Sequence, residues 1–195
     1  MSRITPRLYV GDFETAKNLS FLKSNNINTI VNCSRELENI YPTEFNYINL
    51  ALDDVVTQDL SGVLEPTANE IISHIKNKKN VFVHCYAGVS RSTTIIIYTI
   101  MKFHKWDFEK SLNFVKKMHP RTNPNPGFIK QLTGGSVDQN VVSADLRETF
   151  DAPDNLYKSD GKKWKNMQFD SPGEDIPEYS KPDKGRRNIY AHIFS

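Results

Sequence analysis

Cysteine is scarce in this sequence, with two residues among 195. So few cysteines do not build a disulfide framework, and they suit a reducing compartment. Long apolar runs are lacking as well, because none approaches the about 18 residues that span a bilayer. Residues 1–6 also lack the apolar stretch of a signal peptide. We therefore expect a protein of the cytoplasm or the nucleus that does not bind membranes.

An excess of charge of one sign is also missing. The chain has 25 Lys and Arg against 23 Asp and Glu, which gives a formal net charge of +2. Its overall electrostatic field is therefore too weak to favour nucleic acid as a partner. Two basic clusters, 162–165 and 184–187, lie among acidic residues, and we interpret them as solvated linker rather than as nucleic-acid sites.

Segments typical of strands and of helices alternate along residues 7–132. Short apolar runs indicate buried strands, and longer segments with apolar residues at helical spacing indicate helices. This alternation predicts a single α/β domain whose mostly parallel central sheet is flanked by helices. The expected strands span 7–11, 28–32, 47–50 and 81–84, and the expected helices span 12–23, 61–75, 107–118 and 126–132, with a further helix from residue 91.

The segment 84–92, His-Cys-Tyr-Ala-Gly-Val-Ser-Arg-Ser, has the residues of an anion-binding site. It joins an expected strand to an expected helix, so backbone N–H groups at the positive end of the helix dipole can surround a phosphate dianion. The same field favours the thiolate of Cys85, which is its nucleophilic form. Gly88 lets the loop wrap closely around an anion, and the guanidinium of Arg91 can hold two phosphate oxygens at once. The segment therefore predicts a phosphatase.

The pattern His-Cys-x-x-Gly-x-x-Arg-Ser resembles the signature of the cysteine-dependent protein phosphatases, and Ala-Gly-Val-Ser-Arg-Ser is similar to their dual-specificity branch. Segments 4–11, 26–34 and 123–132 also resemble that family, so the resemblance covers about residues 3–134. It implies the cysteine-phosphatase fold and hydrolysis of phosphotyrosine and phosphoserine or phosphothreonine in proteins through a cysteinyl phosphate. It also implies that no metal or cofactor is needed and that the partners are phosphorylated proteins.

In this resemblance, segment 84–92 is the phosphate-binding loop. Besides the nucleophile and the arginine, it contains His84, Tyr86, Ala87, Gly88, Val89, Ser90 and Ser92. We expect His84 to bond to loop carbonyls and to keep the surroundings of the nucleophile electropositive. Ser92 would donate to the cysteine sulfur when the phosphoenzyme is hydrolysed, unless it is only the first hydroxyl of the helix. Asn125 would brace the loop, with an ordinary turn asparagine as the alternative.

The general acid of such an enzyme must lie in a loop that can reach the departing oxygen. Segment 49–59 follows an expected strand, precedes an expected helix and resembles the family's general-acid loop. The register of the preceding strand favours Asp54, and Asp53 remains the alternative because its spacing to Cys85 is equally suitable. We expect Asp59 to cap the following helix.

The second cysteine, Cys33, follows the expected strand 28–32 at the edge of the sheet where Cys85 lies. In some related phosphatases a cysteine after a similar strand acts as a resolving thiol, so the resemblance makes Cys33 a candidate redox partner of the nucleophile. A thiolate nucleophile oxidises readily, which gives such a partner a purpose. The alternative is that Cys33 is a small buried apolar residue.

The composition changes after residue 135. Residues 136–195 are rich in Asp, Lys, Asn and Pro, with isolated aromatic residues and no sustained periodicity. Such a segment is typical of a flexible tail; the alternative is an extension that wraps around the domain. We therefore expect a catalytic domain over residues 1–135 and a polar C-terminal extension over residues 136–195.

Two other functions are compatible with this kind of domain. A phosphoinositide or RNA 5′-triphosphate phosphatase would use the same chemistry, but such relatives place lysines in the loop and end it in Arg-Thr-Gly. Here the loop has no lysine and ends in Arg-Ser-Thr. A non-catalytic phosphoprotein-binding scaffold would lack the nucleophile or the arginine, and Cys85 and Arg91 are both present. Phosphorylated proteins are therefore the expected substrates.

Overall fold

The computed structural model describes residues 1–134, so the expectations for residues 136–195 lie outside the described part. Five strands form one sheet in the order β1-β2-β5-β3-β4. Four of them are parallel, and β1 pairs antiparallel with β2 at one edge, which confirms the expected mostly parallel sheet. The strands are β1 (Ser2–Thr5), β2 (Leu8–Gly11), β3 (Ile27–Ser34), β4 (Asn46–Leu52) and β5 (Asn80–His84).

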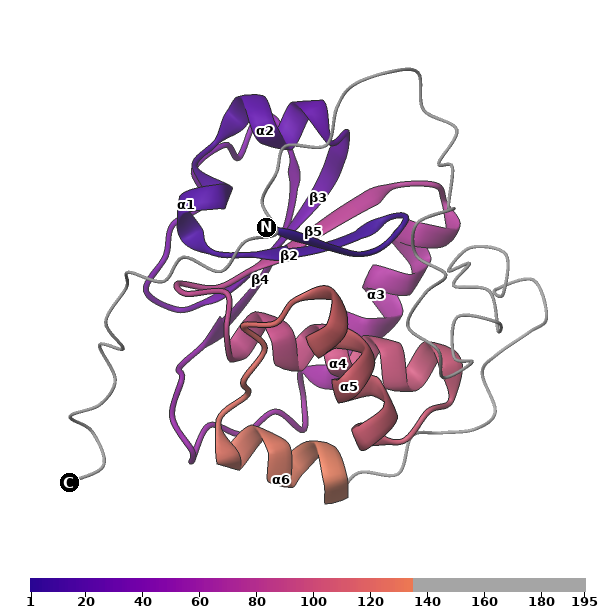
Figure 1. The fold of residues 1–195 in the computed structure, drawn as a ribbon. Helices are drawn as coiled ribbons and strands as arrows, with labels where there is room; N and C mark the ends of the chain where they lie inside the picture. The colour runs from indigo at the N-terminus through magenta and orange to yellow at the C-terminus, as the bar shows by residue number, and fades with distance from the viewer. Residues whose placement is uncertain (135–195) are drawn as a thin grey trace, which may run out of the picture. The chain divides into compact units, whose positions relative to one another are not determined.

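Helices cover both faces of the sheet (Figure 1). On one face, Ala16 and Leu22 from the first two helices join Ile30 and Phe82 from the strands in a small apolar core. The other helices pack on the opposite face around a larger core. The helices are α1 (Phe13–Ala16), α2 (Leu19–Ser24), α3 (Leu64–Lys76), α4 (Arg91–His104), α5 (Phe108–Met118) and α6 (Pro126–Gly134). The expected α/β domain is confirmed.

The single helix expected over residues 12–23 is wrong, because the structure has two short helices there. Asp12 caps α1 as expected, through a hydrogen bond from the N–H of Thr15 at 3.0 Å. Asn18 then accepts a bond from the N–H of Phe21 at 3.0 Å and starts α2. Asparagine competes for backbone donors in this way, and so it favours a helix start over a helix interior.

Helix α3 begins at Leu64, later than expected. Asp59 accepts bonds from the N–H and the hydroxyl of Ser61 at 2.9 Å in the turn that precedes the helix. The expectation that Asp59 caps the helix is therefore wrong, because this turn separates the two. Pro66 lies in the first turn of α3, where its missing N–H breaks no helical bond.

Helix α4 is buried along most of its length and is tied to α3 by a carboxylate. Tyr98 Oη donates to Glu65 Oε2 at 2.7 Å, and Lys102 forms an ion pair with the same side chain. A buried lysine needs such a partner, since an unpaired charge in the interior is costly. These contacts fix the helix whose N-terminus follows the phosphate-binding loop.

Three parallel strands end at the same edge of the sheet. Their register aligns Gly11 of β2 and Asn32 of β3 with His84 of β5. The chain therefore leaves the three strands at neighbouring points, and the loop from β5 enters α4 there. In open α/β sheets, ligands bind beyond the carboxyl ends of the strands, so this edge is where a site is expected.

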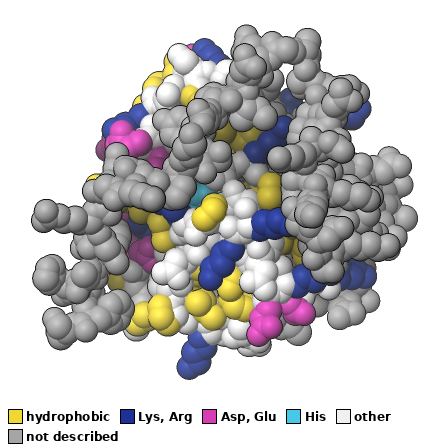
Figure 2. Space-filling model, in the orientation of Figure 1, with side chains coloured by type: hydrophobic (Ala, Val, Ile, Leu, Met, Phe, Trp, Pro, Cys, Tyr) yellow, Lys and Arg dark blue, Asp and Glu magenta, His cyan; other side chains and the backbone are white. Residues whose placement is uncertain are grey.

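Polar and apolar side chains mix on the surface of the described part. Figure 2 shows apolar side chains that reach the surface on one face among lysine, arginine and acidic side chains. None of the helices within residues 1–134 is both long and apolar enough to cross a membrane.

Candidate functional site

The phosphate-binding loop turns its carbonyl groups outward. Four consecutive carbonyls after Cys85 accept hydrogen bonds from outside the loop. The bonds run from Phe13 N to Tyr86 O at 3.1 Å, from Arg121 Nη2 to Ala87 O at 3.1 Å, from His119 Nε2 to Gly88 O at 2.8 Å and from Asn123 N to Val89 O at 2.9 Å. In a trans peptide the N–H points away from the preceding carbonyl. The N–H groups that follow these carbonyls therefore point inward and form a cradle for an anion.

Gly88 is the residue on which this shape depends most. Its φ of 67° lies in the left-handed region, which glycine adopts without steric cost. A Cβ at this position would also lie 2.7 Å from the carbonyl carbon and oxygen of Gly11, at the end of β2. Both the backbone conformation and the close approach of the two chain segments therefore require glycine.

Cys85 lies at the centre of the cradle and is almost completely buried. Its Sγ atom lies 3.3 Å from Oγ of Ser92, a fully buried residue in the first turn of α4. A hydroxyl at this distance can donate to a thiolate, and the helix dipole favours the same charge. The structure thus brings together the expected nucleophile and the expected sulfur-bonding serine.

Hydrogen bonds from one nitrogen, Nη1, hold the buried guanidinium of Arg91 in place. Nη1 donates to Oε2 of Glu36 at 2.7 Å and to the carbonyl of Leu52 at 3.1 Å. Burial lowers the pKa of Arg91, but Glu36 and the nearby Cys85 and Asp54 outweigh burial and raise that pKa above its ordinary value. Nε makes no hydrogen bond within the described residues. This N–H remains available for a phosphate oxygen.

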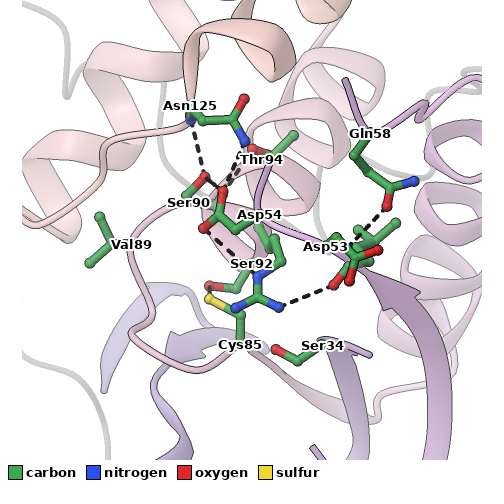
Figure 3. Close-up of polar contacts among 12 residues, drawn as sticks. Ser34, Asp53, Asp54, Gln58, Cys85, Val89, Ser90, Ser92, Thr94 and Asn125 are labelled. Carbon is green, nitrogen blue, oxygen red and sulfur yellow. Dashed lines mark hydrogen bonds and ion pairs between the residues drawn. The ribbon is translucent and has the colours of Figure 1, made fainter. Parts of the chain in front are cut away.

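Asp54 is held against the end of the loop (Figure 3). Its Oδ1 atom accepts bonds from Oγ of Ser90 at 2.7 Å and from Nδ2 of Asn125 at 2.8 Å. Its Oδ2 atom lies 3.8 Å from Nε of Arg91. The N–H of Asn125 also donates to Ser90 Oγ at 3.0 Å, so Asn125 braces the loop as expected. The carboxylate is thus fixed beside the phosphate cradle.

Asp53 points elsewhere. Both of its carboxylate oxygens accept from Nε of Arg35, at 3.0 and 3.1 Å, on the exposed surface. Its N–H donates to Oε1 of Gln58 at 3.0 Å, as Figure 3 also shows. Of the two candidate acids, therefore, Asp54 is the one that contacts the phosphate-binding loop.

His84 does not have the electrostatic role expected from the sequence. Its ring is buried and stacks on that of Phe82, with centroids 5.6 Å apart. Burial lowers the pKa of His84 to about 4, although a hydrogen bond with the backbone of Cys85 and the charge of Asp12 favour protonation. The ring is therefore neutral at physiological pH. The expectation that its charge keeps the nucleophile in electropositive surroundings is wrong.

Cys33 lies in β3, immediately after the residue that pairs with His84 of β5. The two cysteines therefore follow aligned positions of adjacent parallel strands, and both belong to the same apolar core. Burial and the neighbouring Cys85 raise the pKa of the Cys33 thiol well above its ordinary value. The structure thus brings Cys33 close to the nucleophile and keeps it protonated.

Two groups with clear roles at the site were missed from the sequence. Glu36, in the loop after β3, holds Arg91, and this hydrogen bond lowers the pKa of Glu36. His119, after α5, holds the carbonyl of Gly88 through Nε2 and accepts from the hydroxyl of Ser2 through Nδ1, at 2.8 Å. The one sequence signal for these two residues is the position of Glu36, just past the end of a strand at the edge of the sheet where the site lies.

Comparison with known proteins agrees with this geometry. A family model described as the catalytic domain of dual specificity phosphatases matches residues 8–135. Protein phosphatase Slingshot homolog 3 of Homo sapiens is 37% identical over 143 residues, which cover 73% of this chain and 21% of that protein. Dual specificity protein phosphatase 1B of Arabidopsis thaliana is 35% identical over 132 residues, which cover 68% of this chain and 79% of that protein.

Solved structures give the same result. The crystal structure of DUSP15 matches with a TM-score of 0.68 and 29% identity, over 76% of this chain and 94% of that one. The chain spans about a fifth of the length of the Slingshot relative, at 21%. The family model covers most of the described residues, and both relatives are more than 30% identical to this chain. The solved structure shares the fold. The chain belongs to the dual-specificity phosphatase family.

Proposed function

We propose that this chain hydrolyses phosphotyrosine and phosphoserine or phosphothreonine in proteins through a cysteinyl-phosphate intermediate. One observation carries the proposal: the loop that begins at Cys85 has its carbonyls bonded from outside, so its N–H groups point inward, and Nε of Arg91, which makes no hydrogen bond within the described residues, lies 3.8 Å from Oδ2 of Asp54. A nucleophile, an anion cradle and an acid in this arrangement suit phosphoryl transfer. We further propose that it acts in the cytoplasm or the nucleus, where the thiol stays reduced.

In the first step the Cys85 thiolate attacks phosphorus, and the bond from phosphorus to the leaving oxygen breaks. Asp54 delivers its proton to that oxygen, so the alcohol or phenol leaves neutral. The loop N–H groups and Arg91 bind the equatorial oxygens, on which negative charge gathers in the transition state. These donors are already fixed by the outward carbonyl bonds and by Glu36, so little reorganisation is needed.

In the second step water attacks the phosphocysteine, and Asp54, now a carboxylate, accepts a proton from that water. The bond from sulfur to phosphorus breaks, and inorganic phosphate and the Cys85 thiolate result. The Ser92 hydroxyl, 3.3 Å from the sulfur, can donate to the departing thiolate and so favours its release. The cycle restores the starting protonation of all three groups.

Substrate class is tested with a matched panel of phosphotyrosyl and phosphothreonyl peptides, a phosphoinositide and an RNA 5′-triphosphate, with Cys85→Ser as the control. We expect both peptides to be hydrolysed and the other two to be poor substrates, since no lysine of the loop is available to bind additional phosphates. A scaffold without activity would bind the peptides and release no phosphate. Faster hydrolysis of the lipid or the RNA would replace the proposal with the corresponding alternative.

His119 is expected to position the loop. His119→Ala leaves the Gly88 carbonyl without its buried donor, a loss of about 1–3 kcal/mol, so affinity for inorganic phosphate should fall by roughly 10-fold. His119→Gln keeps an N–H donor at a similar reach and should restore part of that affinity. Competitive inhibition by phosphate and the melting temperature are measured for both variants. Unchanged phosphate inhibition in the alanine variant would contradict this role.

Cys33 is expected to protect the nucleophile from irreversible oxidation. Peroxide converts the Cys85 thiolate to a sulfenic acid. Cys33, once its thiol has given up its proton, can attack that sulfur to form a disulfide, and the sulfenic hydroxyl leaves as water. Activity after peroxide and then a thiol reductant should return in the wild type and stay low in Cys33→Ser. Equal recovery in the two proteins would leave Cys33 as a packing residue.

A further inference from the structure

Three large apolar side chains are exposed on the segments that carry Cys85 and Asp54. Within residues 1–134 the exposed large apolar side chains are Ile40 at 39%, Val55 at 49%, Val56 at 60% and Tyr86 at 63%. Val55 and Val56 directly follow Asp54, and Tyr86 directly follows Cys85. Exposed apolar patches mark interaction surfaces, and these three side chains directly follow the nucleophile and the candidate acid in the chain.

The backbone that carries these side chains is fixed. The carbonyl of Tyr86 accepts from the N–H of Phe13 at 3.1 Å, and the carbonyl of Val55 accepts from the N–H of Gln58 at 3.1 Å. The carbonyl of Val56 packs so closely on Gly127 that a Cβ added there would lie 2.0 Å from its oxygen. Exposure of these three side chains therefore does not come from a loosely held loop.

Three arginines near the site, among residues 1–134, are paired with carboxylates. The pairs are Arg121 with Asp12 at 3.6 Å, Arg35 with Asp53 at 3.0 Å and Arg91 with Glu36 at 2.7 Å. An exposed ion pair with Arg121 or Arg35 would be worth little to an acidic side chain of a substrate, and the neighbouring carboxylates would repel that side chain. Acidic residues next to the phosphorylated residue of a substrate therefore gain little favourable interaction here. Apolar residues can contact Val55, Val56 and Tyr86.

We propose that Val55, Val56 and Tyr86 form an apolar rim that selects phosphopeptides with apolar side chains next to the phosphorylated residue, over those with acidic neighbours. The inference rests on the proposed protein phosphatase activity and specifies its substrates. A peptide whose phosphate reaches Cys85 must cross the segments that carry the rim, since these adjoin Cys85 and Asp54. Partial burial of one apolar side chain there is worth about 10-fold in kcat/KM.

The test compares two phosphotyrosyl peptides that differ only in leucine or glutamate on both sides of the phosphotyrosine. For each variant, kcat/KM is normalised to its own rate on a small aryl phosphate. The wild type should prefer the leucine peptide by about 10-fold. Tyr86→Ala and the double variant Val55→Ser/Val56→Ser should each reduce that ratio, and Tyr86→Phe should keep it. Ile40→Ala, which changes an exposed apolar residue on another segment of the chain, should also keep it.

Direct binding separates this inference from the proposed activity. Affinity of the Cys85→Ser variant for the same two peptides measures the preference without turnover. Equal affinity for the two peptides, or a preference that survives loss of Tyr86 and of both valines, would overturn the rim. If the wild type hydrolyses neither the aryl phosphate nor any peptide, the proposed function is overturned, whatever the binding preference.

Discussion

Replacement of Cys85 by serine is expected to reduce phosphate release by about 10⁴-fold or more while phosphopeptide binding persists. The serine hydroxyl is a much weaker nucleophile, because an alcohol loses its proton in the loop far less readily than a thiol does. The cradle of N–H groups and Arg91 does not depend on the sulfur, so the phosphate should still bind. Phosphate release and peptide affinity are measured on the same preparation.

Chelators provide the control for this result. The proposed steps use Cys85, Arg91 and Asp54 and no metal, so a chelator should leave wild-type turnover unchanged. Turnover that persists in Cys85→Ser, or that disappears with the chelator, would contradict the assigned nucleophile.

Asp54→Ala is expected to slow hydrolysis of phosphopeptides by roughly 10²–10³, as for a positioned general acid. Aryl phosphates with good leaving groups need little protonation, so their hydrolysis should fall less. Asp54→Asn keeps an acceptor for Ser90 and Asn125 but has no proton to give, and it should show the same leaving-group dependence. The rates are measured on a series of aryl phosphates and on one phosphopeptide.

Asp53→Ala is the matched control for this prediction. Asp53 pairs with Arg35 on the exposed surface, and such pairs contribute little, at about 0–1 kcal/mol. Its loss should leave the rates and their leaving-group dependence almost unchanged. A leaving-group dependence in Asp53→Ala that is absent from Asp54→Ala would move the general acid by one residue.

The order of strands and helices could be predicted because most elements carry strong local signals. Buried parallel strands require continuous apolar runs such as 81–83, and Asp107 caps α5 as the sequence indicates. The failures have local physical causes. Asn18 starts a new helix inside an expected one, and the short β1 has no apolar run, so its pairing with β2 was not foreseen.

Some residues of the site could likewise be predicted from local sequence, and others could not. Cys85, Arg91 and Ser92 are close in sequence, so one pattern identifies them together. The alternation of the preceding strand favours Asp54, but Ala51 has a φ of 46° and interrupts that alternation. Contacts with Ser90 and Asn125, distant in sequence, hold Asp54 instead. Such partners leave no local pattern.

Glu36 and His119 were missed for the same reason. Glu36 bonds to Arg91, which lies 55 positions away in the chain, and His119 bonds to Gly88, which lies 31 positions away. Only the fold brings these pairs together. The charge state of His84 could not be predicted either, because it depends on burial against Phe82 rather than on its neighbours in the sequence.

Trapping the phosphoryl group on Cys85 tests the proposed nucleophile most directly. With a good aryl leaving group, Asp54→Asn should form the phosphocysteine readily, yet hydrolyse it slowly because no carboxylate accepts the proton from water. The reaction is quenched with acid, and the peptide that contains Cys85 is analysed by mass spectrometry. One phosphoryl group is expected on Cys85 and none in Cys85→Ser. Phosphate on another residue, or a first turnover that leaves Cys85 unmodified, would contradict this assignment.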